Sequence, residues 1–194
     1  MRHGALVLLG AISLLVGWVS GAGAEQQVVD GFSANRTLRS RYFSVQIEPG
    51  VSREDLRLRL SVPKSISLSV NPAFSPGGDN LEDQLDVLYL VVSEILDIHL
   101  KNFNGQVKIC EDSASLSRIA MNLFGRPVQN QAFYVVALDT LYVDAQTVTL
   151  GVLGHEMSHA IQTHYFVVPP PEKIQEVLAG YVEYELRRYS GASS

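Results

Sequence analysis

The feature that most constrains this chain is the pentapeptide His155-Glu156-Met157-Ser158-His159, an HExxH motif within a segment of helical periodicity. Residues four apart lie one turn apart on the same helix face, so these two imidazoles can bind one tetrahedral zinc ion. The opposite side of the predicted helix is apolar and comprises Leu150, Leu153, Met157, Ala160 and Ile161. The histidine face is therefore not the core face, and the motif predicts a zinc site.

Zinc needs a third protein ligand, and His164 is the first candidate after the motif. The long form HExxHxxGxxH requires a glycine where this chain has Gln162, and a histidine six residues after the second ligand rather than five. On a continuing helix, His164 points away from His155 and His159. We therefore expect a helix-end histidine and exclude a site of the metzincin type.

The other candidates are carboxylates on the next predicted helix, namely Glu172, Glu176, Glu183 and Glu185. The apolar stripe of that helix is predicted to be Ile174, Val177, Leu178, Tyr181, Val182 and Leu186. Glu176 lies on the opposite face, and the small residues Ala179 and Gly180 beside it favour a close approach to the HExxH helix. Glu183 shares that face, either as a partner that orients a histidine or as a solvated surface glutamate. Glu185 falls on the apolar stripe, which the pattern does not explain.

His155 to His159 followed by Glu176-Val177-Leu178-Ala179-Gly180-Tyr181 resembles the gluzincin metallopeptidases (peptidase MA-like). Members of that class carry HExxH on one helix and a glutamate on the next, often within E-G-L-A-x-Y, from which this chain departs at Val177. The resemblance covers about the last third of the chain. It implies zinc held by His155, His159 and Glu176, and a sheet edge around 133–137 along which an extended peptide pairs.

The resemblance implies a zinc metallopeptidase that hydrolyses peptide bonds through a zinc-activated water, with Glu156 as general base, and the signal peptide described below makes it an exported one. Such a reaction also needs a group that stabilises the oxyanion. Larger gluzincins supply a Tyr or His from a downstream subdomain, but only 18 residues follow Glu176 here. The nearby candidates are Tyr165, Tyr181, Tyr184 and His164, of which Tyr181 is predicted to face the core.

The expectation is therefore a minimal protease or one completed by a partner chain, acting on a peptide or protein. An alternative from another class is a non-catalytic exported zincin-fold module that binds a peptide or protein partner. A structural zinc site ranks third, because Glu156 would then have no purpose and such sites usually close with cysteine.

The first 24 residues predict a signal peptide, with Arg2, an apolar stretch over 5–19 and a small-x-small pattern that places cleavage after Ala24. The alternative, an uncleaved anchor, is disfavoured because the run is shorter than the roughly 20 residues a span needs. The single cysteine, Cys110, permits no internal disulfide and is predicted to be structural. These features favour a secreted or periplasmic protein.

The composition fits one domain with a sizeable core, since 46% of the 194 residues are hydrophobic and 18% are charged. A net charge of −5 without a Lys/Arg cluster argues against a nucleic-acid partner. We expect a flexible leader over 25–40 and a zincin-like domain over 41–194. The segment 52–60 is compatible with a strand or a helix, with helix favoured, and the Pro/Gly-rich loop 61–80 is a lid, a linker or an inhibitor.

The periodicity predicts strands over 42–47, 106–110, 132–138 and 141–143, and helices over 81–101, 113–123, 146–166 and 171–189. This order predicts an α+β fold, a small zincin-like domain in which a short mixed sheet packs against the HExxH helix and the following glutamate helix.

Overall fold

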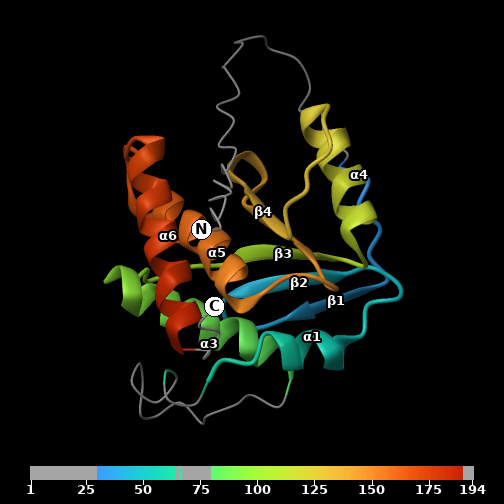
Figure 1. Cartoon of the computed structure of the whole chain (residues 1–194), viewed down its shortest axis with the longest axis horizontal. Helices are drawn as coiled ribbons and strands as arrows, with labels where there is room; N and C mark the ends of the chain where they lie inside the picture. Colours follow the sequence, from blue (N-terminus) through green and yellow to red (C-terminus); the bar gives the residue numbers. More distant parts are fainter. Residues whose placement is uncertain (1–29, 64–65, 67–79, 190–194) are drawn as a thin grey trace, which may run out of the picture.

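The computed structural model describes residues 30–63, 66 and 80–189, which form a five-stranded mixed sheet with helices on both faces (Figure 1). The strands are β1 (Arg36–Arg39), β2 (Phe43–Ile47), β3 (Gly105–Cys110), β4 (Ala132–Val135) and β5 (Thr140–Asp144), in the spatial order β1-β2-β3-β5-β4. The three central strands are parallel, whereas β1 and β4 pair antiparallel at the two edges. The α+β class and the short mixed sheet are therefore confirmed.

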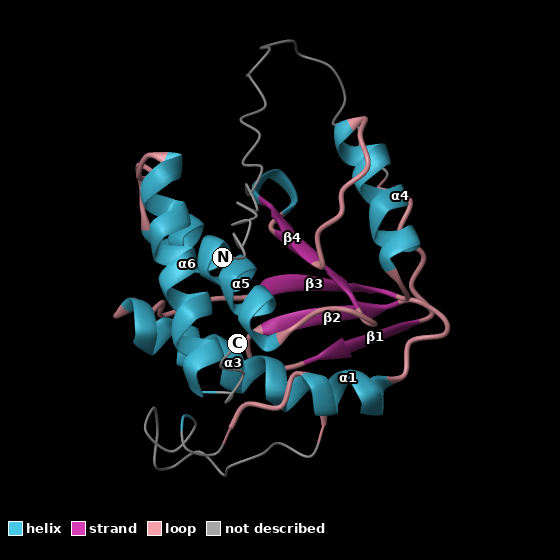
Figure 2. Cartoon of the chain, in the orientation of Figure 1, coloured by secondary structure: helices cyan, strands magenta, loops and turns pink. Residues whose placement is uncertain are grey.

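Helices cover the two faces of the sheet unequally (Figure 2). The larger core lies between the sheet and helices α1 (Arg53–Arg59), α3 (Leu81–Leu96), α5 (Leu150–Tyr165) and α6 (Glu172–Tyr189). A smaller cluster around Leu116, Ile119 and Tyr142 packs α4 (Ser113–Phe124) on the other face. Within the described part of the chain, no helix is both long and apolar enough to span a membrane.

Four helices begin at a residue whose side chain accepts a hydrogen bond from a backbone amide three residues on, at Ser52, Asn80, Asp112 and Thr149. Such caps satisfy amides that have no partner within the helix. The cap at Ser52 confirms the helical alternative for 52–60. Gly125 ends α4 in the left-handed conformation that glycine tolerates, as the sequence indicates.

Several boundaries differ from the expectation. The leader over 25–40 is partly ordered, because β1 pairs with β2 within it and the ordered domain begins before residue 41. Helix α3 stops at Leu96, since Asp97 takes a left-handed conformation with φ of 54°. Helix α5 starts at Leu150 rather than 146, because the Asp144 carboxylate accepts hydrogen bonds from the Gln146 amide and the Thr147 hydroxyl and so forms a turn.

The predicted strand over 132–138 is shorter than expected. It ends at Val135 and continues as a single 3-10 turn, Val136–Leu138, closed by Asp139 in the left-handed region. The predicted signal peptide and most of the loop 61–80 lie outside the described residues. Cys110 is buried, and burial raises the pKa of its thiol to about 12, which fits a structural residue.

Candidate metal and active site

The site lies at the seam between α5 and α6, which pack closely beside the edge strand β4. Two glycines of α5 permit this approach: a Cβ on Gly154 would clash with Leu186, and one on Gly151 would press on Glu183 and Arg187. The small residues expected to serve this purpose on α6 do so only in part. Ala179 is buried in the seam, whereas Gly180 faces solvent.

The orientation predicted for α6 is wrong for half of its apolar stripe. Val182 and Leu186 are buried and Leu178 is half-buried, but Ile174, Val177 and Tyr181 are exposed. Glu185, which the stripe did not explain, is buried and lies 3.5 Å from Arg188. The face packed on α5 is the one that carries the carboxylates.

Donor atoms of three residues meet in the seam. Nε2 of His155 lies 3.3 Å from Nε2 of His159, and the two oxygens of Glu176 lie 3.5 Å and 3.3 Å from these nitrogens. Ligand atoms about 2.0–2.1 Å from one tetrahedral zinc ion are roughly 3.3 Å apart. The donor set of two imidazoles and a carboxylate, and its spacing, therefore fit zinc.

Some polar atoms of this cluster have no hydrogen-bond partner. Oε1 of Glu176 and Nδ1 of His159 are buried without a hydrogen bond. Burial raises the pKa of Glu176, and burial together with His155 lowers the pKa of His159 to about 4, so His159 is neutral at physiological pH. A neutral imidazole beside a half-buried carboxylate whose Oε1 has no hydrogen bond is a state that a bound metal would satisfy.

Glu183 contacts the other ring nitrogen of His155, with Oε2 3.3 Å from Nδ1, and forms an ion pair with Arg187. Burial opposes protonation of His155, but Glu183, Glu156 and Glu176 outweigh it and raise the pKa of that imidazole. The contact with His155 lowers the pKa of Glu183. Of the two alternatives for Glu183, the structure favours the partner that orients a histidine.

Glu156 lies at the point where α5 meets the edge strand. Its Oε2 accepts a hydrogen bond of 3.1 Å from the backbone amide of Tyr134 on β4. Burial raises the pKa of this carboxyl group to about 7. A carboxylate with a pKa near 7 can both accept and release a proton at physiological pH.

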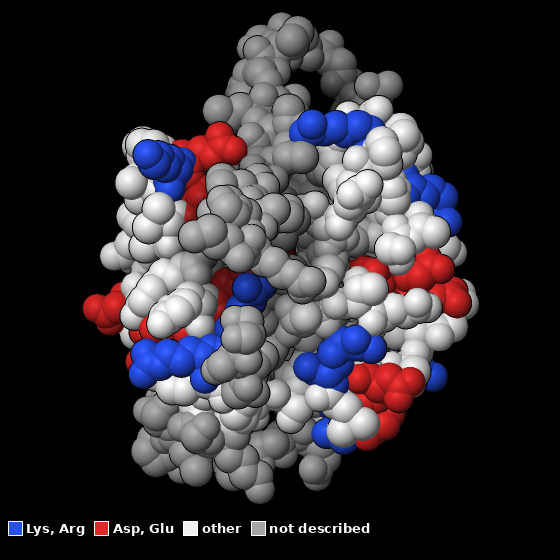
Figure 3. Space-filling model, viewed as in Figure 1, with Lys and Arg blue, Asp and Glu red and all other residues white. Residues whose placement is uncertain are grey.

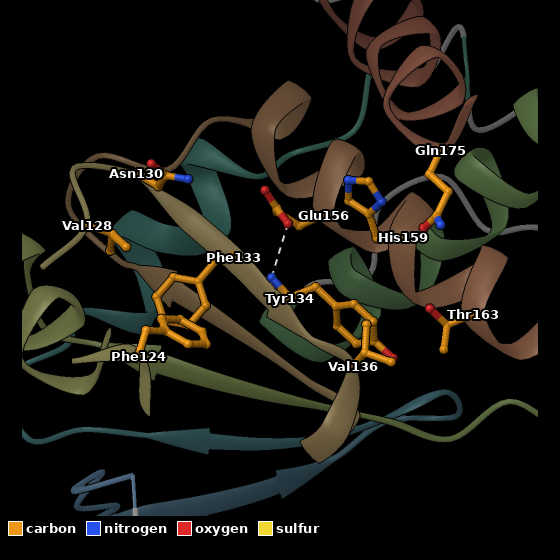
Figure 4. Close-up of a pocket in the computed structure, with 10 residues that line it drawn as sticks. All are labelled: Phe124, Val128, Asn130, Phe133, Tyr134, Val136, Glu156, His159, Thr163 and Gln175. Carbon is orange, nitrogen blue, oxygen red and sulfur yellow. Dashed lines mark hydrogen bonds between the residues drawn. The ribbon is translucent and has the colours of Figure 1, made fainter. Parts of the chain in front are cut away.

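A pocket opens beside Glu156 and His159 between β4, α5 and the segment that follows α4 (Figure 4). One side is apolar, lined by Phe124, Val128, Phe133 and Val136, and the remaining wall carries Asn130, Tyr134, Thr163 and Gln175. Glu156 is the only acidic residue among these described lining residues, and no Lys or Arg is among them. The pocket therefore suits an uncharged, largely apolar group.

A hydrogen-bond network fixes the end of β4 to the end of α5. The Tyr134 hydroxyl donates to Oδ1 of Asp139 at 2.8 Å, and Nε2 of His164 lies 2.9 Å from the same oxygen. His164 also packs edge-on against Phe103. His164 is thus a helix-end residue, as expected, and it is not among the donors around Glu176.

The structure does not bring the predicted oxyanion candidates to the site. Tyr165 is exposed and packs on Phe166, while Tyr181 lies on the solvent side of α6, so its predicted core position is wrong. Tyr184 is also exposed. Tyr134 was not predicted to belong to the site, and its only signal in the sequence was its place in the predicted edge strand.

The location of β4 at the sheet edge agrees with the arrangement that the gluzincin resemblance implies. Comparisons with known protein families, with curated proteins and with solved structures find no match to the chain.

Proposed function

We propose that the chain is an exported zinc metallopeptidase that cleaves peptide bonds at the seam between α5 and α6. The observation that carries the proposal is the spacing of 3.3–3.5 Å among donor atoms of His155, His159 and Glu176, with the Glu156 carboxylate beside them. Zinc, held by those three residues, would supply Lewis acidity and lower the pKa of water. The remaining steps depend on the chain itself.

Glu156 acts as the general base, taking a proton from water and delivering it to the leaving amine. Its pKa of about 7 suits both transfers, and the Tyr134 amide holds its carboxylate in place. Tyr134 is held in turn by hydrogen bonds through Asp139 to His164. These bonds fix the distance between β4 and α5 at the site.

The edge strand provides the binding surface for an extended peptide. Backbone groups of successive residues in a strand point to alternate sides, so those of Ala132 and Tyr134 point away from β5. Ala132 is buried and the Tyr134 amide donates to Glu156, so we expect a peptide to pair with this edge from the Tyr134 carbonyl onward. A peptide added along this edge would place one side chain over the pocket lined by Phe124 and Phe133. We therefore expect cleavage next to an apolar residue.

The test begins with metal content, measured by mass spectrometry on tag-free protein. One zinc per chain, lost in Glu176→Ala and His159→Ala but kept in the neighbouring control Val177→Ala, supports the site. Peptide-library turnover that disappears in Glu156→Gln while zinc is kept supports the reaction. A folded wild type that takes up no supplied zinc contradicts the proposal.

A second candidate function is a zinc-binding module that recognises a peptide without cleaving it. The observation in its favour is that Tyr165, Tyr181 and His164 all lie away from the donor cluster. This candidate predicts a full complement of zinc and peptide binding along β4, with no cleavage of any library member. Turnover dependent on Glu156 would exclude it.

A further inference from the structure

Helix α6 has a continuous apolar stripe on the side that faces away from α5. Ile174, Val177, Tyr181 and Tyr184 recur at helical spacing and are 48%, 60%, 52% and 60% exposed. None of the four packs against the core clusters. In Figure 3 the surface over α6, at the left of the view, is largely uncharged between basic side chains at its ends.

Gly180 borders this stripe between Val177 and Tyr184, and the monomer has no evident need for it. A Cβ at this position would meet nothing within 4 Å, and its φ is not in the left-handed region. A glycine within a helix costs about 1 kcal/mol relative to alanine. A glycine that the monomer does not require, beside the exposed Val177 and Tyr184, leaves a notch that can accept a side chain of another helix.

The stripe is suited to pairing with itself in an antiparallel arrangement. It carries no charged residue from Ile174 to Tyr184, and Arg188 follows at its C-terminal end. A parallel pair would align the two helix dipoles unfavourably. An antiparallel pair centred on Tyr181 instead places the aliphatic stem of Arg188 over Ile174 of the other copy.

The area available is enough for a modest interface. Two half-exposed tyrosines offer on the order of 200 Å² per copy, and the full stripe with its rim buries roughly 1,000 Å² over two copies. That value is at the lower limit for specific interfaces, which corresponds to a concentration-dependent dimer rather than an obligate one.

We propose that the outer face of α6 is a dimerisation surface, on which a second copy of this chain packs antiparallel around Gly180 and Tyr181. The same helix carries Glu176 and Glu183 on its inner face, so the pair would hold α6 between α5 and its symmetry mate. The inference does not depend on zinc or on catalysis.

Disulfide crosslinking of the full chain tests the geometry. The native thiol does not compete, because Cys110 is buried and its pKa is raised to about 12. Under mild oxidation, Tyr181→Cys is expected to give covalent dimers. Ile174→Cys is expected to give none, because its two copies would be about 20 Å apart across the twofold axis. Leu58→Cys, on an equally exposed apolar position of α1, is the control for random collisions.

Sedimentation equilibrium tests the association itself. We expect a monomer–dimer equilibrium for the wild type, weakened at least tenfold by Val177→Lys and by Gly180→Leu but not by Leu58→Lys. Gly180→Leu has open space in the monomer, so its thermal stability should not fall. Crosslinking at both 174 and 181 would overturn the antiparallel arrangement, and a wild type that stays monomeric at about 100 μM, or floats with phospholipid vesicles as a monomer, would overturn the dimer.

Discussion

The two faces of α6 differ from those of a simple amphipathic helix, because carboxylates lie beside the buried Val182 and Leu186, and apolar side chains lie on the exposed face. Its inner face contributes Glu176 and Glu183 to the seam with α5, whereas its outer face presents Val177 and Tyr181 to solvent. Placing carboxylates in a seam between helices costs free energy unless a cation or hydrogen bonds compensate. A side-chain arrangement that opposes the simplest packing solution is typical of a functional site rather than of a stabilising one.

The largest difference between the two faces should be in stability. Leu186→Ala removes a fully buried side chain from the seam and is expected to lower the free energy of unfolding by about 2–5 kcal/mol. Tyr184→Ala, on the outer face, should change it by about 0.5 kcal/mol or less in the monomer. Urea unfolding at low protein concentration measures both. Equal losses would show that the outer face is also packed.

The next largest effect concerns metal affinity. Glu183→Gln removes the charge beside Nδ1 of His155 without removing a ligand, and should weaken zinc binding about 10- to 100-fold. Glu185→Gln on the same helix is the matched control, because Glu185 contacts Arg188 and not the histidines. Competition with a chelator gives the affinities. If both variants bind zinc like the wild type, Glu183 does not orient His155.

Paired glycine substitutions compare the packing of the two faces directly. Gly154→Ala is expected to destabilise the fold by about 1–2 kcal/mol, because its methyl group would meet Leu186 in the seam. Gly180→Ala should instead stabilise the monomer by up to about 1 kcal/mol through helix propensity. Thermal melts of both variants against the wild type give the sign. Stabilisation by Gly154→Ala would contradict the close approach of α5 and α6.

The smallest expected effect concerns Asp30, a carboxylate outside the seam that forms an ion pair with Lys108. Burial opposes ionisation of Asp30, but hydrogen bonds from Lys108, Tyr142 and the Phe32 amide lower its pKa. Its contribution to stability is therefore present above the unfolded-state pKa, near 3.9, and is lost as the pH falls below it.

Asp30→Asn should consequently be less stable than the wild type at pH 7, and the difference should shrink towards pH 3. Denaturant midpoints at several pH values measure that difference. A gap that stays constant with pH would show that Asp30 contributes through packing alone.

Local signals were sufficient for much of the fold. The caps at Asn80 and Asp112 set helix starts by hydrogen bonds within four residues, and Gly125 ends α4 by its own conformation. The spacing of His155 and His159 is likewise a property of one helix. These features depend on neighbours in sequence, so a pattern can predict them.

The remaining features depend on contacts distant in sequence. Strand β1, with the sequence Arg-Thr-Leu-Arg, has no strand pattern and is ordered by pairing with β2. Periodicity defined two faces of α6 but not which one meets α5, a choice that depends on Gly151, Gly154 and the histidines. The amide of Tyr134 reaches Glu156 across 22 positions in sequence, and no local pattern encodes that contact.

The order of the strands also has a consequence for when the site forms. The three central strands are parallel and are separated by long connections in the sequence. We therefore expect the sheet to form slowly. The metal-binding donors and Glu156 lie between His155 and Glu176, after all five strands of the described sheet in the sequence. The donors therefore meet only after the sheet has assembled. A metal bound there should slow unfolding and leave the refolding rate unchanged, because it would stabilise the folded state but not the transition state for folding.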